Sequence, residues 1–247
     1  MKKLITICLV VWLTLGFAVA SRASYTIDAD LSDWGVTPFS DWAPDGTADY
    51  EEHDNVNCYS VAGYSEYYDF EALYFDDDSQ NFYFAVVGSH PLVGNGDLAI
   101  DLNGDFLVSA HGVVTGLDYA IQTGSGTGNV LANPTWHNTT YHQWPDGWQG
   151  SPYTSSGGTI LGSATFAIQY YPAMESGTYI LEAAVPRGLL GGGIPGDPVG
   201  IHISNWCGND SINLKADIDH VIPAPGAIFL GSIGVGLVGQ IRRRKML

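Results

Sequence analysis

Basic side chains are scarce in this chain, and most of them lie at its two ends. The 247 residues include nine Lys and Arg against 26 Asp and Glu. Residues 21–222 keep three of these cations and all 26 acids, which leaves a formal charge of −23 before His is counted. So acidic a body repels nucleic acid and anionic lipid head groups. The composition therefore excludes nucleic acid as a partner.

Cysteine is equally rare, with three residues in the whole chain. Cys8 lies in the N-terminal apolar run, so the rest of the chain keeps Cys58 and Cys207. In an oxidising compartment such an even pair predicts one long-range disulfide, and two unrelated thiols are the alternative. The bridge would close a loop of about 150 residues, for which chain entropy gives about 4–5 kcal/mol of stabilisation.

Catalytic signatures are also lacking. The sequence has neither the Gly-x-Ser-x-Gly nucleophile elbow nor the His-Glu-x-x-His zinc motif. Two carboxylic acids can hydrolyse a glycosidic bond, but 26 acids make any pairing arbitrary. The seven His are scattered, without the spacing of metal ligands. We therefore expect a non-catalytic protein, and a glycoside hydrolase-type enzyme is the alternative.

The N-terminus has the three parts of a secretory signal peptide. Lys2 and Lys3 precede an apolar run over residues 4–17, and small residues follow at 18 and 20. This order predicts a signal peptide over residues 1–20, so the chain is expected to be exported.

The C-terminus predicts a membrane span. An apolar, glycine-rich run over about residues 226–241 follows a proline-containing lead-in that begins at Ile222. Twenty residues at about 1.5 Å each are enough to cross a hydrocarbon core of about 30 Å. The basic cluster 242–245 would hold its end in the cytoplasm. A buried C-terminal helix is the alternative, but burial in a globular domain does not explain the four cations that follow the apolar run.

The order of the parts in this tail resembles a known sorting signal. The sequence Pro223-Ala224-Pro225 comes first, then the glycine-rich span, then Arg242-Arg243-Arg244. This order resembles the PEP-CTERM tail of exosortase-dependent bacterial surface proteins, with Pro-Ala-Pro in place of the usual Pro-Glu-Pro. The resemblance covers residues 222–247. It implies membrane anchoring, cleavage near the prolines by an exosortase-type processing enzyme, and delivery to the cell surface or extracellular matrix.

The body between these ends has the pattern of β-strands. Short apolar or alternating runs rich in aromatic and β-branched residues are separated by Gly, Pro, Asp and Asn. Residues 81–88 are apolar on both faces, which predicts a central strand, whereas residues 212–219 alternate and predict one wet face. We expect one domain over residues 21–221, an all-β, antiparallel, jelly-roll-like β-sandwich. The expected strands are 70–75, 81–88, 97–102, 159–170, 177–185, 199–204 and 212–222.

Aromatic side chains gather in a polar stretch within residues 120–158. Trp136, Tyr141, Trp144 and Trp148 lie there among His, Asn, Gly and Pro. Sugar rings pack on indole, and large aromatics on a wet loop usually mark a contact site. The alternative, given equal weight, is that these side chains fold back as a small core that pins a long loop.

One acidic loop has the ligand types of a calcium site. Asp101, Asn103 and Asp105 alternate around Gly104, and calcium prefers clustered carboxylate and carbonyl oxygens. The loop departs from the EF-hand pattern, because Phe106 stands where that motif has glycine. A solvated turn is the alternative, since Asp, Asn and Gly are ordinary turn residues.

Five segments of the body together resemble a binding-domain family. They are residues 26–34, 71–78, 81–86, 96–101 and 182–187. They resemble the family 9-like carbohydrate-binding modules and the related DOMON-type sandwiches. The resemblance implies a sugar-binding β-sandwich, often with structural calcium, and haem in some DOMON relatives. We expect the body to bind extracellular polysaccharide; a structural envelope or biofilm-matrix protein with no small ligand is the alternative.

Overall fold

The computed structural model describes residues 25–38, 42–52, 69–89, 96–109, 113–139, 151–172, 177–205 and 210–219. The predicted signal peptide and the predicted sorting tail 222–247, with its membrane span, lie outside the described residues, as do Cys58, Cys207, Tyr141, Trp144 and Trp148. In the part of the chain that is described, no helix has the length and apolarity needed to cross a membrane.

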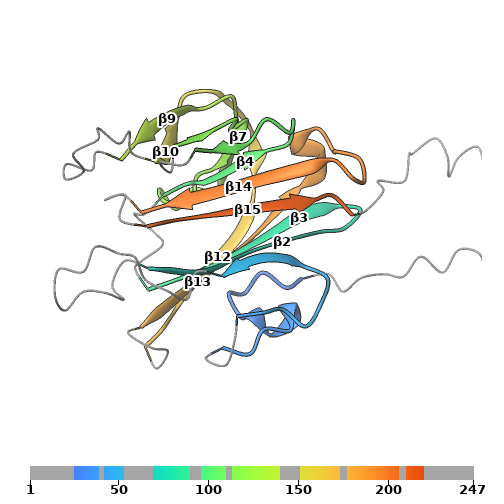
Figure 1. Cartoon of the computed structure of the whole chain (residues 1–247), viewed down its shortest axis with the longest axis vertical. Helices are drawn as coiled ribbons and strands as arrows, with labels where there is room; N and C mark the ends of the chain where they lie inside the picture. Colours follow the sequence, from blue (N-terminus) through green and yellow to red (C-terminus); the bar gives the residue numbers. More distant parts are fainter. Residues whose placement is uncertain are drawn as a thin grey trace, which may run out of the picture.

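Two antiparallel sheets pack face to face, which confirms the all-β sandwich (Figure 1). The five-stranded sheet has the order β1 (Asp49–Glu52), β2 (Phe70–Asp77), β3 (Asn81–Gly88), β13 (Thr178–Pro186) and β12 (Thr165–Tyr171). The six-stranded sheet has the order β11 (Thr159–Ser163), β8 (Asn129–Ala132), β7 (Tyr119–Ile121), β4 (Leu98–Asp101), β14 (Pro198–Ser204) and β15 (Ser211–Asp217).

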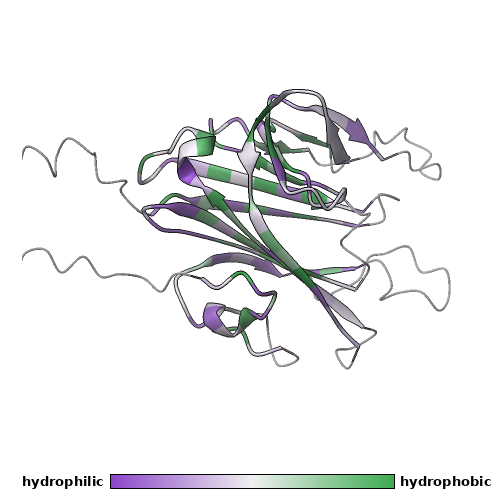
Figure 2. Cartoon of the chain, turned by 180° about the vertical axis from the view of Figure 1, so that it is seen from behind, coloured by the Kyte–Doolittle hydropathy of each residue, from purple (hydrophilic) through white to green (hydrophobic). Residues whose placement is uncertain are grey.

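The main core lies between the two sheets, where alternate residues of each strand point inward. Phe82, Phe84 and Val86 of β3 belong to this core together with Ile201 and Ile203 of β14. Figure 2 shows hydrophobic residues along the strands of both sheets. The runs over residues 81–88 and 199–204, both expected as strands, therefore form strands that face this core.

A third layer covers the other face of the five-stranded sheet. Residues 25–38 and 42–48 form it, including the short 3₁₀-helix η1 (Leu31–Trp34), and it appears in blue at the bottom of Figure 1. Leu31 and Trp34 pack against Tyr83 and Val87, which lie on the outward side of β3. β3 is thus covered on both faces, as its doubly apolar sequence predicts.

A buried carboxylate fastens this layer to the sheet. Glu182 of β13 is fully buried and accepts hydrogen bonds from Trp34 Nε1 at 2.6 Å, from the Ala29 amide at 2.6 Å and from the Asp28 amide at 3.0 Å. Burial raises the pKa of Glu182 to about 7, against the opposing effect of these three hydrogen bonds.

The stretch expected as a single strand over residues 159–170 divides into two. It forms β11 in one sheet, bends at Ala164, and continues as β12 in the other sheet. The Ala164 amide donates to the Gly128 carbonyl at the bend. The chain thereby passes from one sheet to the other along one side of the sandwich.

The first and last described residues are fastened at the same place, the end of β2. The Tyr25 hydroxyl donates to Asp76 at 2.6 Å, and the Asp219 amide donates to Asp77 at 2.8 Å. Asp77 also forms a buried ion pair of 2.7 Å with Arg187 of the 3₁₀-helix η2 (Arg187–Leu190). The chain therefore enters and leaves the sandwich at the same end of the sandwich.

Candidate ligand-binding site

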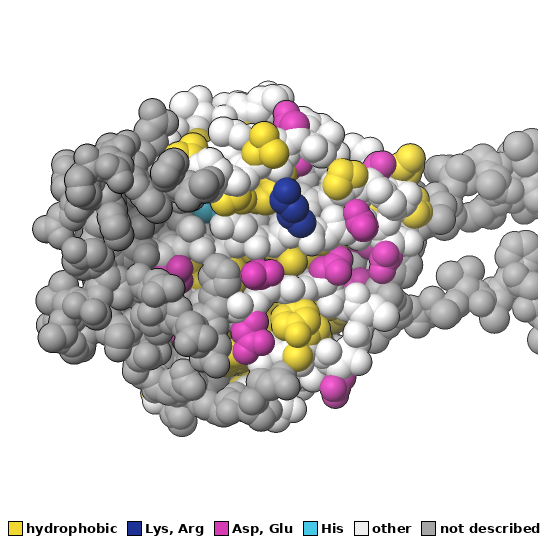
Figure 3. Space-filling model, viewed as in Figure 1, with side chains coloured by type: hydrophobic (Ala, Val, Ile, Leu, Met, Phe, Trp, Pro, Cys, Tyr) yellow, Lys and Arg dark blue, Asp and Glu magenta, His cyan; other side chains and the backbone are white. Residues whose placement is uncertain are grey.

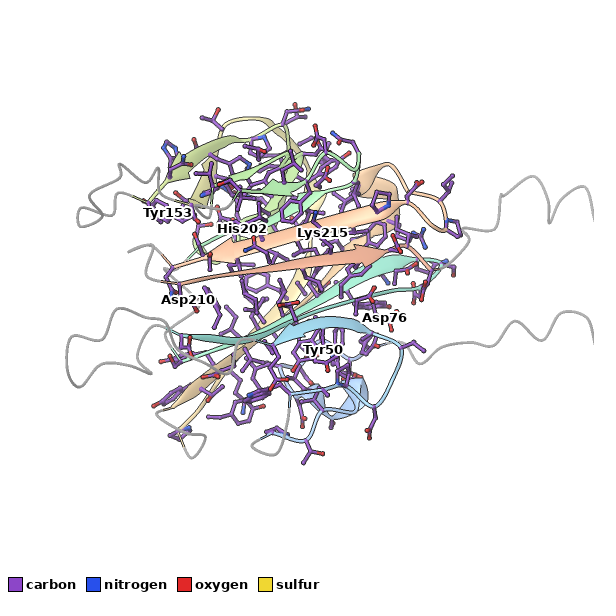
Figure 4. All side chains as sticks on the ribbon, in the orientation of Figure 1. Tyr50, Asp76, Tyr153, His202, Asp210 and Lys215 are labelled. Atoms are coloured by element: carbon purple, nitrogen blue, oxygen red, sulfur yellow. The ribbon has the colours of Figure 1, made fainter. Side chains whose placement is uncertain are left out.

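The outward face of the six-stranded sheet is polar at its centre. Because Ile201 and Ile203 face the core, their neighbours Gly200 and His202 face outward. The strand register puts Gly200 between Asp101 of β4 and Lys215 of β15. In Figure 4, the labelled His202 and Lys215 lie along β14 and β15.

The loop after β4 is folded around the carboxylate of Asp101. This side chain is fully buried and accepts hydrogen bonds from the amides of Asn103 at 3.0 Å, Gly104 at 3.2 Å and Phe106 at 3.0 Å. Gly104 has a φ of +83°, a backbone conformation that glycine adopts without strain. These contacts fix the backbone from which the Phe106 side chain projects.

Phe106 lies directly on the backbone of β14. A Cβ atom built on Gly200 would be 2.2 Å from Cγ of Phe106, so only glycine leaves room for the ring at this position. The Nζ atom of Lys215 is 5.7 Å from the centroid of the same ring, within reach of a cation–π interaction.

A pocket of about 310 Å³ opens beside this ring. Its buried lining includes Phe106 and Asp101, and its exposed polar lining residues are Lys215, Asp217 and Asp49 of β1. The volume is at the lower end of the roughly 300–1,000 Å³ usual for small-molecule sites. The exposed groups are one ammonium and two carboxyls, which can donate to and accept from hydroxyl groups of a ligand.

Lys215 is an exposed cation on a face that carries many acidic side chains (Figure 3). Among the described residues the other cation is Arg187, which is buried in its ion pair with Asp77. Lys215 is thus the one exposed cation of the described part of the chain, and Figure 3 shows one dark-blue side chain on this face with magenta acids around it.

A hairpin covers the part of the same sheet face that contains His202 and Ser204. It consists of β9 (Thr135–Asn138) and β10 (Pro152–Ser156), which the sequence did not predict as strands. The Pro152 carbonyl accepts from Ser204 Oγ at 2.8 Å and lies 3.0 Å from Nε2 of His202. Ser155 donates through its amide and its hydroxyl to Asp97, at 2.8 Å and 2.7 Å.

Burial favours the neutral form of both titratable side chains under this hairpin, Asp97 and His202. It raises the pKa of Asp97, while hydrogen bonds from Ser155 and Gly124 oppose the shift. It lowers the pKa of His202, while contacts with Asn213 and Pro152 oppose the shift. The hairpin is therefore held by buried polar contacts as well as by packing.

Of the predicted aromatic residues, the structure describes Trp136. It lies on β9 opposite Ser155, is partly buried, and its Nε1 atom is buried without a hydrogen-bond partner among the described residues. Tyr141, Trp144 and Trp148 follow in the sequence between β9 and β10, outside the described residues. The hairpin that leads into and out of the aromatic stretch is therefore docked on the same sheet face as the pocket.

The predicted calcium ligands Asp101 and Asn103 are engaged in hydrogen bonds within their turn and to Asp118. Asn103 donates through Nδ2 to Asp118 at 3.1 Å and accepts through Oδ1 from the Asp105 amide at 3.0 Å. Burial raises the pKa of Asp118, and the nearby Asp101 and Asp105 raise it further. Within the described residues, no group of three or more His, Cys, Asp or Glu side chains is arranged to hold a metal ion. Calcium binding therefore stays a prediction.

Sequence reasoning missed Phe106 and Lys215 as parts of one site. Lys215 carried a usable signal, because it is one of three cations in residues 21–222 and lies on the wet face of an alternating strand. Phe106 gave none, since its position depends on its contact with Gly200 of the distant strand β14.

Neither the models of known protein families nor the curated protein sequences compared with this chain match it.

Proposed function

We propose that this chain is an exported, non-catalytic protein that binds extracellular polysaccharide and is held at the cell surface by its C-terminal tail. The observation that carries the proposal is the shared face. The pocket beside Phe106 and the hairpin that contains Trp136 both lie on the outward side of the six-stranded sheet. A polymer laid along β14 would meet both.

The chemistry of the pocket supports a sugar as the ligand. Lys215 can donate to a hydroxyl group and Asp217 can accept from one, while the largely buried ring of Phe106 forms an apolar wall of the pocket. Asp101 and Gly200 hold that ring in position before any ligand arrives, which lowers the entropy lost on binding.

The geometry of the chain ends supports anchoring at one end. Tyr25, which closely follows the predicted signal peptide, and Asp219, which shortly precedes the predicted tail, are both fastened to the end of β2. β14 runs from Pro198, paired with Asp217, to Ser204, beside the hairpin. Six residue steps of about 3.3 Å each separate the tail from the hairpin by about 20 Å. A tail in the membrane would then leave the hairpin on the outer side.

A glycan array probed with the purified full chain in mild detergent tests the binding proposal. We expect retention on at least one class of bacterial or plant polysaccharide, with no release of reducing sugar on prolonged incubation. A chain that binds no glycan on the array would refute the proposal and favour a purely structural matrix protein. Release of reducing sugar would favour the hydrolase alternative.

Protease treatment of intact spheroplasts tests the export proposal. Protease added outside should digest the sandwich, because the proposed topology exposes it on the outer side of the membrane. A sandwich that stays protected until the spheroplasts are lysed would contradict export.

A further inference from the structure

Two loops at the end where the chain leaves the sandwich carry exposed apolar side chains. Ile194, after η2, is 66% exposed, and Leu107 and Val108 of β5 (Leu107–Val108) are 63% and 40% exposed. The turn that leads into β5 lies against the start of β14, since a Cβ atom built on Gly104 would be 3.0 Å from Cγ of Pro198. Figure 3 shows hydrophobic and acidic side chains next to one another toward this end, on the right.

The loop of Ile194 is tied to the last described residues. The Gly196 amide donates to the Ile218 carbonyl at 2.8 Å, and the Ile218 amide donates to the Asp197 carbonyl at 2.9 Å. Asp219 follows directly and is bound to Asp77. The exposed Ile194 is therefore held close to the point from which the C-terminal tail departs.

The tail between this point and the predicted membrane span is short. Seven residue steps separate Asp219 from Gly226, the start of the apolar run. At full extension they reach about 25 Å, and a flexible chain of that length has a root-mean-square span of about 15 Å. The head-group layer itself takes up about 5–8 Å of that distance. The end of the sandwich that carries Ile194 would thus stay on average within about 10 Å of the membrane surface.

We propose that this end, formed by Ile194, Leu107 and Val108, rests on the outer surface of the lipid bilayer while the tail is anchored. The inference rests on the proposed membrane span of the tail. Apolar side chains at such a surface can enter the head-group boundary. The neighbouring Asp217 and Asp219 are exposed and repel anionic lipid, so the contact favours zwitterionic head groups.

The test is lipid photo-crosslinking of the full chain reconstituted in phosphatidylcholine vesicles. A photo-crosslinking amino acid replaces Ile194 in one variant and Ile160 in the matched control. Ile160 is 64% exposed, almost the same as Ile194, but it lies on β11 at the opposite edge of the six-stranded sheet. Both positions are at the surface, so neither replacement disturbs the core. We expect lipid adducts at 194 to exceed those at 160 at least fivefold, and to fall when phosphatidylglycerol replaces part of the phosphatidylcholine.

Equal adduct yields at the two positions, or protein adducts instead of lipid adducts at 194, would overturn the inference. Extraction with alkaline carbonate distinguishes a failure of the proposed membrane contact from a failure of the proposed membrane anchor. A chain that stays in the vesicles but gives no lipid adduct at 194 removes the membrane contact alone. A chain that carbonate extracts removes the anchor and the contact together.

Discussion

Replacing Glu182 by Gln should change how the stability of the sandwich depends on pH. In the folded protein the pKa of Glu182 is about 7, above its ordinary value of 4.5, because burial disfavours the charged form. Between pH 4.5 and 7, Glu182 therefore keeps its proton in the folded state, whereas in the unfolded state it has lost it. The stability that this proton contributes is present below pH 4.5 and is lost as the pH rises to about 7.

The size of this effect follows from the shift. One pKa unit corresponds to about 1.4 kcal/mol, so the wild type should lose about 3 kcal/mol of unfolding free energy through this group. Gln cannot titrate, so the Glu182→Gln variant should lack this loss. The variant keeps one oxygen for Trp34 Nε1 but turns an amide group toward the Ala29 and Asp28 amides. It should therefore be less stable than the wild type at pH 5, with a difference that shrinks by about 2.5 kcal/mol at pH 8, because part of the loss already occurs below pH 5.

Urea unfolding at constant ionic strength between pH 5 and pH 8, followed by tryptophan fluorescence, measures the difference. The control is Asp45→Asn, which removes an exposed acid in the same N-terminal layer. Its difference from the wild type should stay constant over this range. If the Glu182→Gln difference also stays constant, or grows with pH, the three hydrogen bonds outweigh burial and the reasoning is wrong.

Three further changes test other parts of the structure. Asp77→Ala should cost about 3–5 kcal/mol in urea unfolding, because it removes the carboxylate that is paired with the buried Arg187; equal stability would show that the pair contributes nothing. Gly200→Ala should cost about 1–3 kcal/mol and weaken glycan binding, because the new methyl group displaces Phe106; unchanged binding would separate the ring from the site. Calcium should raise the melting midpoint more than magnesium at matched ionic strength, and equal shifts from the two ions would leave only charge screening.

The buried faces of β3 and β15 could be predicted from the sequence, because the spacing of apolar residues along a strand determines which faces are buried. Residues 81–88 carry apolar side chains on both sides, and β3 is covered on both sides. The alternation over residues 212–219 likewise matches the buried and exposed faces of β15. The bend at Ala164 was missed, because an uninterrupted β-pattern does not show where a strand changes sheets.

The third layer and the candidate site depend on contacts that no local pattern records. Trp34 and Glu182 are 148 residues apart in the chain, yet one hydrogen bond joins them. Asp101 was expected to point at a metal ion, whereas in the structure its carboxylate accepts three amides of its own loop. Lys215 becomes a candidate ligand contact because Phe106, from a distant loop, lies beside it.

The most direct test of the central claim is the affinity of the full chain for its best array glycan, measured by calorimetry for Lys215→Ala, Asp217→Asn and the control Asp45→Asn. Lys215 and Asp217 line the pocket, and Asp45 lies in the N-terminal layer across the five-stranded sheet. A lost hydrogen bond to a ligand typically costs about 1 kcal/mol or more, so each pocket variant should bind at least about fivefold more weakly. The melting midpoints and the affinity of Asp45→Asn should stay near the wild-type values. Wild-type affinity in both pocket variants would contradict the claim that this face of the sandwich binds the polysaccharide.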